Sequence, residues 1–151
     1  KYALAMEESL EIISQRINLV ITMPNADTMG TIFRDKLYSL KDKRKETVFL
    51  IENFGKRNYF SAMQHAEFLI GNTSSGIIEA ASFQKYVVNV GDRQKGRAKS
   101  NNVIDAKFNK QDIINAAYKC LLSKEFIGEN VYFQQNSAKN IIKIIKNYEK
   151  L

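Results

Sequence analysis

Short runs of apolar residues alternate along the chain with longer segments in which apolar residues recur every three or four positions. The first pattern is typical of buried strands, and the second of helices that bury one face. Strands are predicted at residues 18–23, 47–51, 68–71 and 86–90, with a short edge strand at 103–104. Helices are predicted at residues 6–17, 28–40, 59–66, 74–83, 111–122 and 137–150. This order, with strands rich in Val, Ile and Leu, predicts an α/β fold in which a parallel sheet carries helices on both faces.

The domain organisation follows from what separates these elements. The chain has no linker rich in Pro or Gly, no repeat and no low-complexity stretch, and 44% of its residues are hydrophobic. We therefore expect residues 1–151 to form a single domain with one core. A helical pattern begins near the first residue and no Met precedes it, which we interpret as a chain that starts inside a larger fold.

The formal net charge of +7 indicates an anionic partner. A nucleic acid is one interpretation, and a small acidic ligand on a lysine-rich surface is the other. The lysines are scattered and are not interleaved with aromatic residues, so we favour the small ligand and expect no nucleic acid. The single cysteine, Cys120, cannot form an internal disulfide, which fits a cytoplasmic protein. No apolar run approaches the roughly 20 residues that cross a bilayer, so we expect no membrane partner.

The turn that begins at Gly71 follows a predicted strand and opens a predicted helix, at the sheet edge where such folds bind ligands. Small and hydroxyl residues at 73–76 let an anion approach the unpaired N–H groups of a helix start. A carboxylate at Glu79, one helical turn later, suits the two hydroxyls of a ribose. An ordinary Ser-rich helix cap explains the same residues. The turn alone leaves both interpretations open.

A second loop, residues 91–97, leaves the next predicted strand and carries Arg93 and Arg97 beside two glycines. Arginine binds phosphate oxygens through two parallel hydrogen bonds, and glycines let the backbone close over a ligand. By itself the loop also fits a solvated basic surface. Because both loops leave the carboxyl ends of strands in one sheet, we expect them to converge on one diphosphate ligand.

Other reactive residues give weaker signals. His65, the only histidine, is predicted to lie on a helix face, and Cys120 to lie in the core. No cluster has the spacing of metal ligands, and no nucleophile motif surrounds Ser74. The sequence therefore identifies no catalytic residue, metal site or cofactor in this chain.

Several segments resemble the hydrolysing UDP-N-acetylglucosamine 2-epimerases. They are Pro-Asn-Ala-Asp at 24–27, Ile-Gly-Asn-Thr-Ser-Ser-Gly-Ile-Ile-Glu-Ala at 70–80, Val-Asn-Val-Gly-Asp-Arg-Gln-Lys-Gly-Arg at 88–97 and Asn-Val-Ile at 102–104. The last helix pattern, from residue 136, also resembles the closing helix of that family. The run Gly-Asp-Arg-Gln-Lys-Gly-Arg is specific, since the non-hydrolysing 2-epimerases carry a Thr-Glu-Arg-Pro-like sequence there.

The resemblance implies the C-terminal, Rossmann-like half of a GT-B fold, with a UDP-sugar bound in the cleft between two domains. It implies that Asn25 lies near the ligand, that the backbone around Phe54 meets the uracil, that Thr73 and Ser74 bind the diphosphate, that Glu79 binds the ribose, and that Arg93 approaches the nucleotide. The family's His-Pro motif and catalytic carboxylates precede the region that this chain matches, and the run at 129–135 departs from the family's Tyr-Gly-Asp-Gly-like sequence.

The resemblance further implies that the full-length protein eliminates UDP from UDP-N-acetylglucosamine or a related UDP-sugar and hydrates the product to a manno-configured free sugar. That sugar would enter the synthesis of sialic acid and related polysaccharides. We expect the full-length enzyme to be a homo-oligomer, its N-terminal domain to supply catalysis, and this chain alone to be inactive. A GT-B glycosyltransferase and a non-catalytic nucleotide- or RNA-binding module remain the alternatives.

Overall fold

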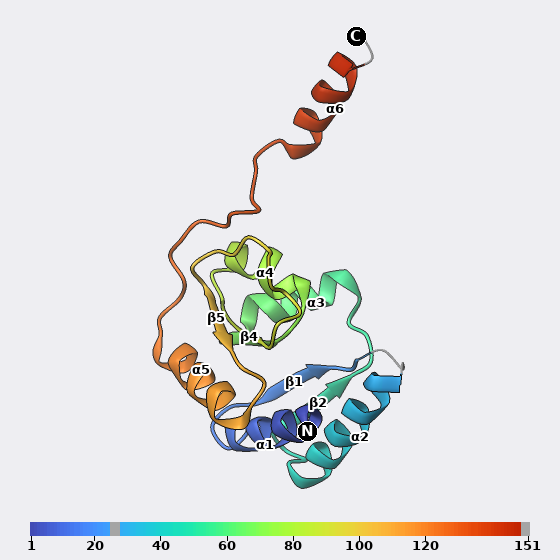
Figure 1. The fold of residues 1–151 in the computed structure, drawn as a ribbon, viewed down its shortest axis with the longest axis vertical. Coiled ribbons are helices and arrows are strands. Elements are labelled where there is room, and N and C mark those ends of the chain that lie inside the picture. Colours follow the sequence, from blue (N-terminus) through green and yellow to red (C-terminus); the bar gives the residue numbers. More distant parts are fainter. Residues whose placement is uncertain (25–27, 149–151) are drawn as a thin grey trace.

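The computed structural model describes residues 1–24 and 28–148, as helices and strands in alternation (Figure 1). The helices are α1 (Tyr2–Ile13), α2 (Thr28–Lys43), α3 (Gly55–His65), α4 (Ser74–Ile78), the 3-10 helix η1 (Ala80–Phe83), α5 (Lys110–Leu122) and α6 (Ser137–Tyr148). The strands are β1 (Leu19–Thr22), β2 (Val48–Ile51), β3 (Phe68–Gly71), β4 (Tyr86–Val90) and β5 (Val103–Ala106). The predicted α/β class is confirmed.

All pairings among the strands are parallel, but the strands form two sheets rather than the single sheet expected. One sheet has the order β1-β2 and the other β3-β4-β5. Between the edges of β1 and β3 lies a cavity of about 1020 Å³ that both strands line. The core beneath the sheets is nevertheless continuous, because α1, α2 and α5 pack against one another or against the strands on that side.

Two apolar cores hold the strands in place. The larger lies under both sheets and includes Ile13 of α1, Leu40 of α2 and Ile113 of α5, all of them fully buried. The smaller lies on the opposite face of the three-stranded sheet, where Met63 of α3 meets Val87 of β4. Helices therefore cover both faces of the sheet that carries the two predicted ligand loops.

Two helix boundaries differ from the prediction. α3 begins at Gly55, four residues before the predicted start, because the Asn53 side chain accepts a hydrogen bond from the Gly55 N–H at 2.7 Å. The helix predicted over 74–83 divides at Glu79 into α4 and η1. There the Ser82 N–H donates to the Glu79 carbonyl at 2.9 Å, a tighter i to i+3 bond that replaces the α-helical pattern.

The last helix, α6, stands away from the rest of the molecule at the end of an extended segment (Figure 1). None of its residues is buried. Its exposed large apolar residues are Ile141, Ile142, Ile144, Ile145 and Tyr148. No helix among the described residues is long and apolar enough to span a membrane.

Candidate nucleotide site at the carboxyl ends of β3 and β4

The turn after β3 is a capped helix start. Gly71 has a φ of +151°, a value that favours glycine, and Thr73 is the N-cap of α4. The Thr73 hydroxyl accepts a hydrogen bond from the Gly76 N–H at 3.3 Å, while the side chains of Thr73 and Ser74 remain exposed. Since α4 has only five residues, its dipole is short, and the backbone donors of the turn contribute more to anion binding than the helix as a whole.

Gly76 lets this turn lie directly on β4. It is buried, and a Cβ atom placed on it would lie 2.9 Å from Cγ1 of Val87. A larger residue would therefore push α4 away from the sheet and carry Thr73 and Ser74 with it. The glycine thus fixes the height of the turn above the carboxyl end of β4.

Two buried polar side-chain atoms, one in α4 and one in the residue that caps its C-terminus, lack a hydrogen-bond partner within the described part of the chain. They are Oγ of Ser75 and Oε2 of Glu79. An unpaired buried polar group costs about 1–3 kcal/mol, and more when it is charged.

The loop after β4 presents two arginines to solvent. Gly91 and Gly96 take φ values of +77° and +84°, which turn the chain back on itself. Arg93 and Arg97 are exposed, and across residues 1–24 and 28–148 neither guanidinium has an ion pair or a hydrogen bond in the structure. Both remain available to bind an anion bidentately.

The two loops meet, as the sequence predicted. Gln94 is only 3% exposed, and its Nε2 donates a hydrogen bond of 2.6 Å to the Asn72 carbonyl in the turn after β3. β3 and β4 are parallel neighbours with Gly71 paired to Asn89, so their loops leave the sheet side by side. Gln94 is not among the site residues predicted from the sequence, and the signal that points to it is its position inside the arginine loop.

The far end of the arginine loop is fastened to β5. Lys99 binds the two carboxylate oxygens of Asp105 at 2.7 and 2.8 Å, and the buried Asn89 donates to the same carboxylate at 2.7 Å. Burial acts to raise the pKa of Asp105, but the hydrogen bonds from Asn89 and Lys99 outweigh it and hold that pKa below its ordinary value. The loop is therefore held at both ends, with its arginines free between them.

Residues 130–132 form a strap across the same region. Asn130 donates to the Ile78 carbonyl at 2.8 Å and to the Ser82 hydroxyl at 2.7 Å. The Val131 N–H donates to Ser100 Oγ, and the Tyr132 hydroxyl donates to the Ala98 carbonyl, at 3.0 and 2.9 Å. This segment, to which no role was assigned from the sequence, thus links α4 to the end of the arginine loop.

Comparison with known proteins identifies the family to which this chain belongs. Residues 2–146 match the family model of the UDP-N-acetylglucosamine 2-epimerases. The chain belongs to this family. The family resemblance seen in the sequence is therefore confirmed.

Two curated relatives and one solved structure are similar to this family member. The hydrolysing GDP/UDP-N,N'-diacetylbacillosamine 2-epimerase of Campylobacter jejuni is 39% identical over 72% of this chain and 28% of its own length. The hydrolysing UDP-N,N'-diacetylbacillosamine 2-epimerase of Legionella pneumophila is 29% identical over 89% of this chain and 35% of its own length. A crystal structure of Methanocaldococcus jannaschii UDP-GlcNAc 2-epimerase in complex with UDP-GlcNAc and UDP matches 96% of this chain and 40% of its own, with a TM-score of 0.71 and 16% identity.

The chain thus spans about a third of the length of the relatives that it matches. The structural match covers nearly the whole chain at low sequence identity, and it establishes the GT-B-like fold. The expected fold, a C-terminal Rossmann-like half of this type, is confirmed.

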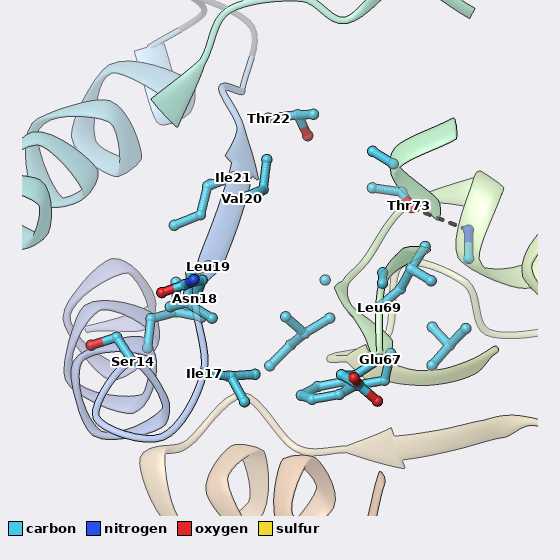
Figure 2. Close-up of a pocket in the computed structure, with 18 of the residues that line it drawn as sticks. Ser14, Ile17, Asn18, Leu19, Val20, Ile21, Thr22, Glu67, Leu69 and Thr73 are labelled. Carbon is cyan, nitrogen blue, oxygen red and sulfur yellow. Dashed lines mark hydrogen bonds between the residues drawn. The ribbon is translucent and has the colours of Figure 1, made fainter. Parts of the chain in front are cut away.

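Of the two remaining predicted site residues, Phe54 lies in the part of this epimerase-family domain that the structure describes. Phe54 is partly buried just before α3 and lines the large cavity between the sheets. Figure 2 shows that cavity, with Val20 and Thr22 of β1 on one side and Leu69 and Thr73 on the other. Asn25, the predicted ligand neighbour after β1, lies outside the described residues.

The two residues set aside in the sequence analysis occupy the places predicted for them. His65 is the last residue of α3 and is exposed on that helix. Cys120 lies in the larger core, and burial raises the pKa of its thiol to about 12, which leaves it protonated and unreactive.

Proposed function

We propose that the whole protein is a hydrolysing UDP-sugar 2-epimerase and that this chain binds the UDP moiety. The sugar would be N-acetylglucosamine or a related acetamido sugar, in line with the substrates named for the relatives. The observation that carries the proposal is the contact of Gln94 with Asn72. It places a loop with two unpaired arginines beside a turn of backbone donors, and the unpaired carboxylate oxygen of Glu79 is close by in sequence.

The proposed roles follow from chemistry at the leaving group. Elimination breaks the bond between C1 of the sugar and the diphosphate oxygen, so negative charge develops on the departing UDP. Arg93, with Thr73, Ser74 and the N–H groups of their turn, would stabilise that charge. Glu79 would accept hydrogen bonds from the ribose hydroxyls. The backbone near Phe54 would meet the uracil, and Asn25 would lie near the ligand.

We further propose that a preceding domain of the whole protein closes the substrate cleft and transfers the protons. The exposed apolar face of α6 supports this, because an isolated helix of 12 residues is marginal in water and needs a partner surface. That face has no partner in the part of the chain that the structure describes. The whole protein would be cytoplasmic and homo-oligomeric.

The reaction is tested by incubating the full-length protein with UDP-N-acetylglucosamine or UDP-N,N'-diacetylbacillosamine in D₂O. A hydrolysing 2-epimerase removes the proton at C2 and returns one from solvent, so the expected products are UDP and a free manno-type sugar with deuterium at C2. Transfer of the sugar to an acceptor, with hydrogen retained at C2, would instead identify a glycosyltransferase. Family membership does not favour that alternative or the nucleotide- or RNA-binding module.

The UDP site is tested by Glu79→Ala in the full-length protein, with UDP binding measured by calorimetry. The loss of a charge-assisted hydrogen-bond acceptor should weaken binding by about 10- to 100-fold. Glu46→Ala, at an exposed residue before β2, serves as the control and should leave the affinity unchanged. An affinity of the Glu79 variant equal to wild type would remove the ribose role.

A further inference from the structure

Gln94 is the exception in its loop. Its neighbours Asp92, Arg93 and Lys95 are exposed, whereas Gln94 is only 3% exposed. Its amide N–H group donates to the Asn72 carbonyl at 2.6 Å. Its own carbonyl oxygen, Oε1, is buried and accepts no hydrogen bond from any described residue.

This side chain determines how the two loops are joined. Among the described residues, the bond from Gln94 to Asn72 is the hydrogen bond that connects the loop after β4 to the turn after β3. The inward Gln94 side chain directly follows Arg93, whose side chain is exposed. The bond therefore limits the distance between the loops at the residue next to Arg93.

We propose that Gln94 is a positioning residue for the diphosphate, a role that rests on the proposed function. It acts through Arg93 and the turn at Asn72, without itself touching the nucleotide. A loop held in its binding conformation loses less conformational entropy when the ligand arrives, so the link raises affinity for the part of the ligand that both loops contact. That part is the diphosphate and not the nucleoside.

Two substitutions in the full-length protein separate this role from simple packing. Gln94→Met keeps the approximate volume and removes the hydrogen bond, and Gln94→Glu keeps the shape but replaces the donor with an acceptor. Gln64→Met, at an exposed glutamine of α3, is the matched control. Binding of UDP and of uridine is measured by calorimetry, and thermal unfolding of each variant is followed in parallel.

We expect both Gln94 variants to bind UDP about tenfold more weakly, with uridine binding close to wild type. The unfolding temperature should stay close to wild type in Gln94→Met and fall in Gln94→Glu, because the latter buries a carboxylate beside the Asn72 carbonyl. In an Arg93→Ala background, Gln94→Met should have a smaller further effect, because the part of its action that passes through that arginine is already lost. The control should match wild type in every measurement.

Three results would overturn the proposal. They are unchanged UDP affinity, an equal loss of UDP and uridine binding, and a full additional loss in the Arg93→Ala background. If wild-type protein fails to bind UDP, the proposed function fails, and this inference falls with it. If wild-type protein binds UDP and the variants bind it equally well, only the role of Gln94 is refuted.

Discussion

The packing of Gly76 against β4 leads to a prediction about how the turn after β3 is held. In Gly76→Ala the added methyl carbon would lie 2.9 Å from Cγ1 of Val87, which is 3% exposed and cannot swing into solvent. Ordinary carbon–carbon contacts lie at about 3.5–4.0 Å, so α4 and β4 must separate by roughly 0.6 Å or more. Thr73 and Ser74 move with the helix.

The expected change in the free energy of unfolding is the difference between two opposing effects of the Gly76→Ala substitution. Overpacking a tight site costs about 1–3 kcal/mol. Replacing a helical glycine with alanine returns up to about 1 kcal/mol of helix propensity. We therefore expect a net loss of about 1–2 kcal/mol in the free energy of unfolding. For a chain of this size, that loss lowers the midpoint temperature of thermal unfolding by roughly 2–8 °C.

A double-mutant cycle in denaturant unfolding of the 151-residue chain isolates the contact. Val87→Ala alone should destabilise the chain, since it removes buried methyl groups. In the double variant the clash with Cγ1 disappears, so Gly76→Ala should cost at least about 1 kcal/mol less than in the wild-type background. Additive free energies in the cycle would refute the contact. In the full-length protein, Gly76→Ala should also weaken UDP binding.

Two further predictions concern stability and activity. Glu7, 3% exposed between α1 and α2, is paired with Lys36 and Lys43 at 3.1 Å. Burial acts to raise the pKa of Glu7, but hydrogen bonds from Lys36, Ser39 and Lys43 hold that pKa below the ordinary 4.5. The ionised Glu7 side chain therefore stabilises the fold fully above pH 4.5, and this contribution is lost as the pH falls through the pKa of the folded state. Glu7→Gln should therefore lower the free energy of unfolding by about 1–2 kcal/mol at pH 7 and have little effect in acid, and an effect independent of pH would contradict this. The 151-residue chain alone should not release UDP from UDP-N-acetylglucosamine, because we propose that the proton-transfer residues lie in a preceding domain. Chromatographic detection of UDP would contradict this proposed division of binding and proton transfer between two domains.

The sequence predicted the fold well where local pattern decides the structure. The apolar runs at 68–71 and 86–90 coincide with β3 and β4, because polar or glycine residues bound each run. The early start of α3 depends on a single hydrogen bond from the Gly55 N–H to the Asn53 side chain, which periodicity does not reveal. The separation of β1 from β3 depends on how helices pack beneath both strands, and neither strand's own pattern encodes it.

The candidate site was likewise predictable where local pattern decides the structure, and not where distant contacts decide it. Convergence of the two loops was predictable, because adjacent parallel strands end at the same edge of a sheet. The burial of Gln94 was not, because the loop lies between two glycines with positive φ, where neither a period of two nor of 3.6 applies. Whether a polar residue in such a loop turns inward depends on a partner distant in sequence, here the Asn72 carbonyl.

The contacts around the candidate site constrain the backbone and leave the groups that we propose to bind the ligand unpaired. Gly76 sets the height of one loop, Gln94 sets its distance from the other, and the Lys99–Asp105 pair anchors the second loop to β5. The guanidinium of Arg93 is left exposed and without an internal partner within the described chain. Such an arrangement suits a leaving group whose charge grows during the reaction, since donors already in place need no reorganisation as the bond breaks. On the proposed function, substitutions at the anchoring residues should therefore reduce diphosphate binding.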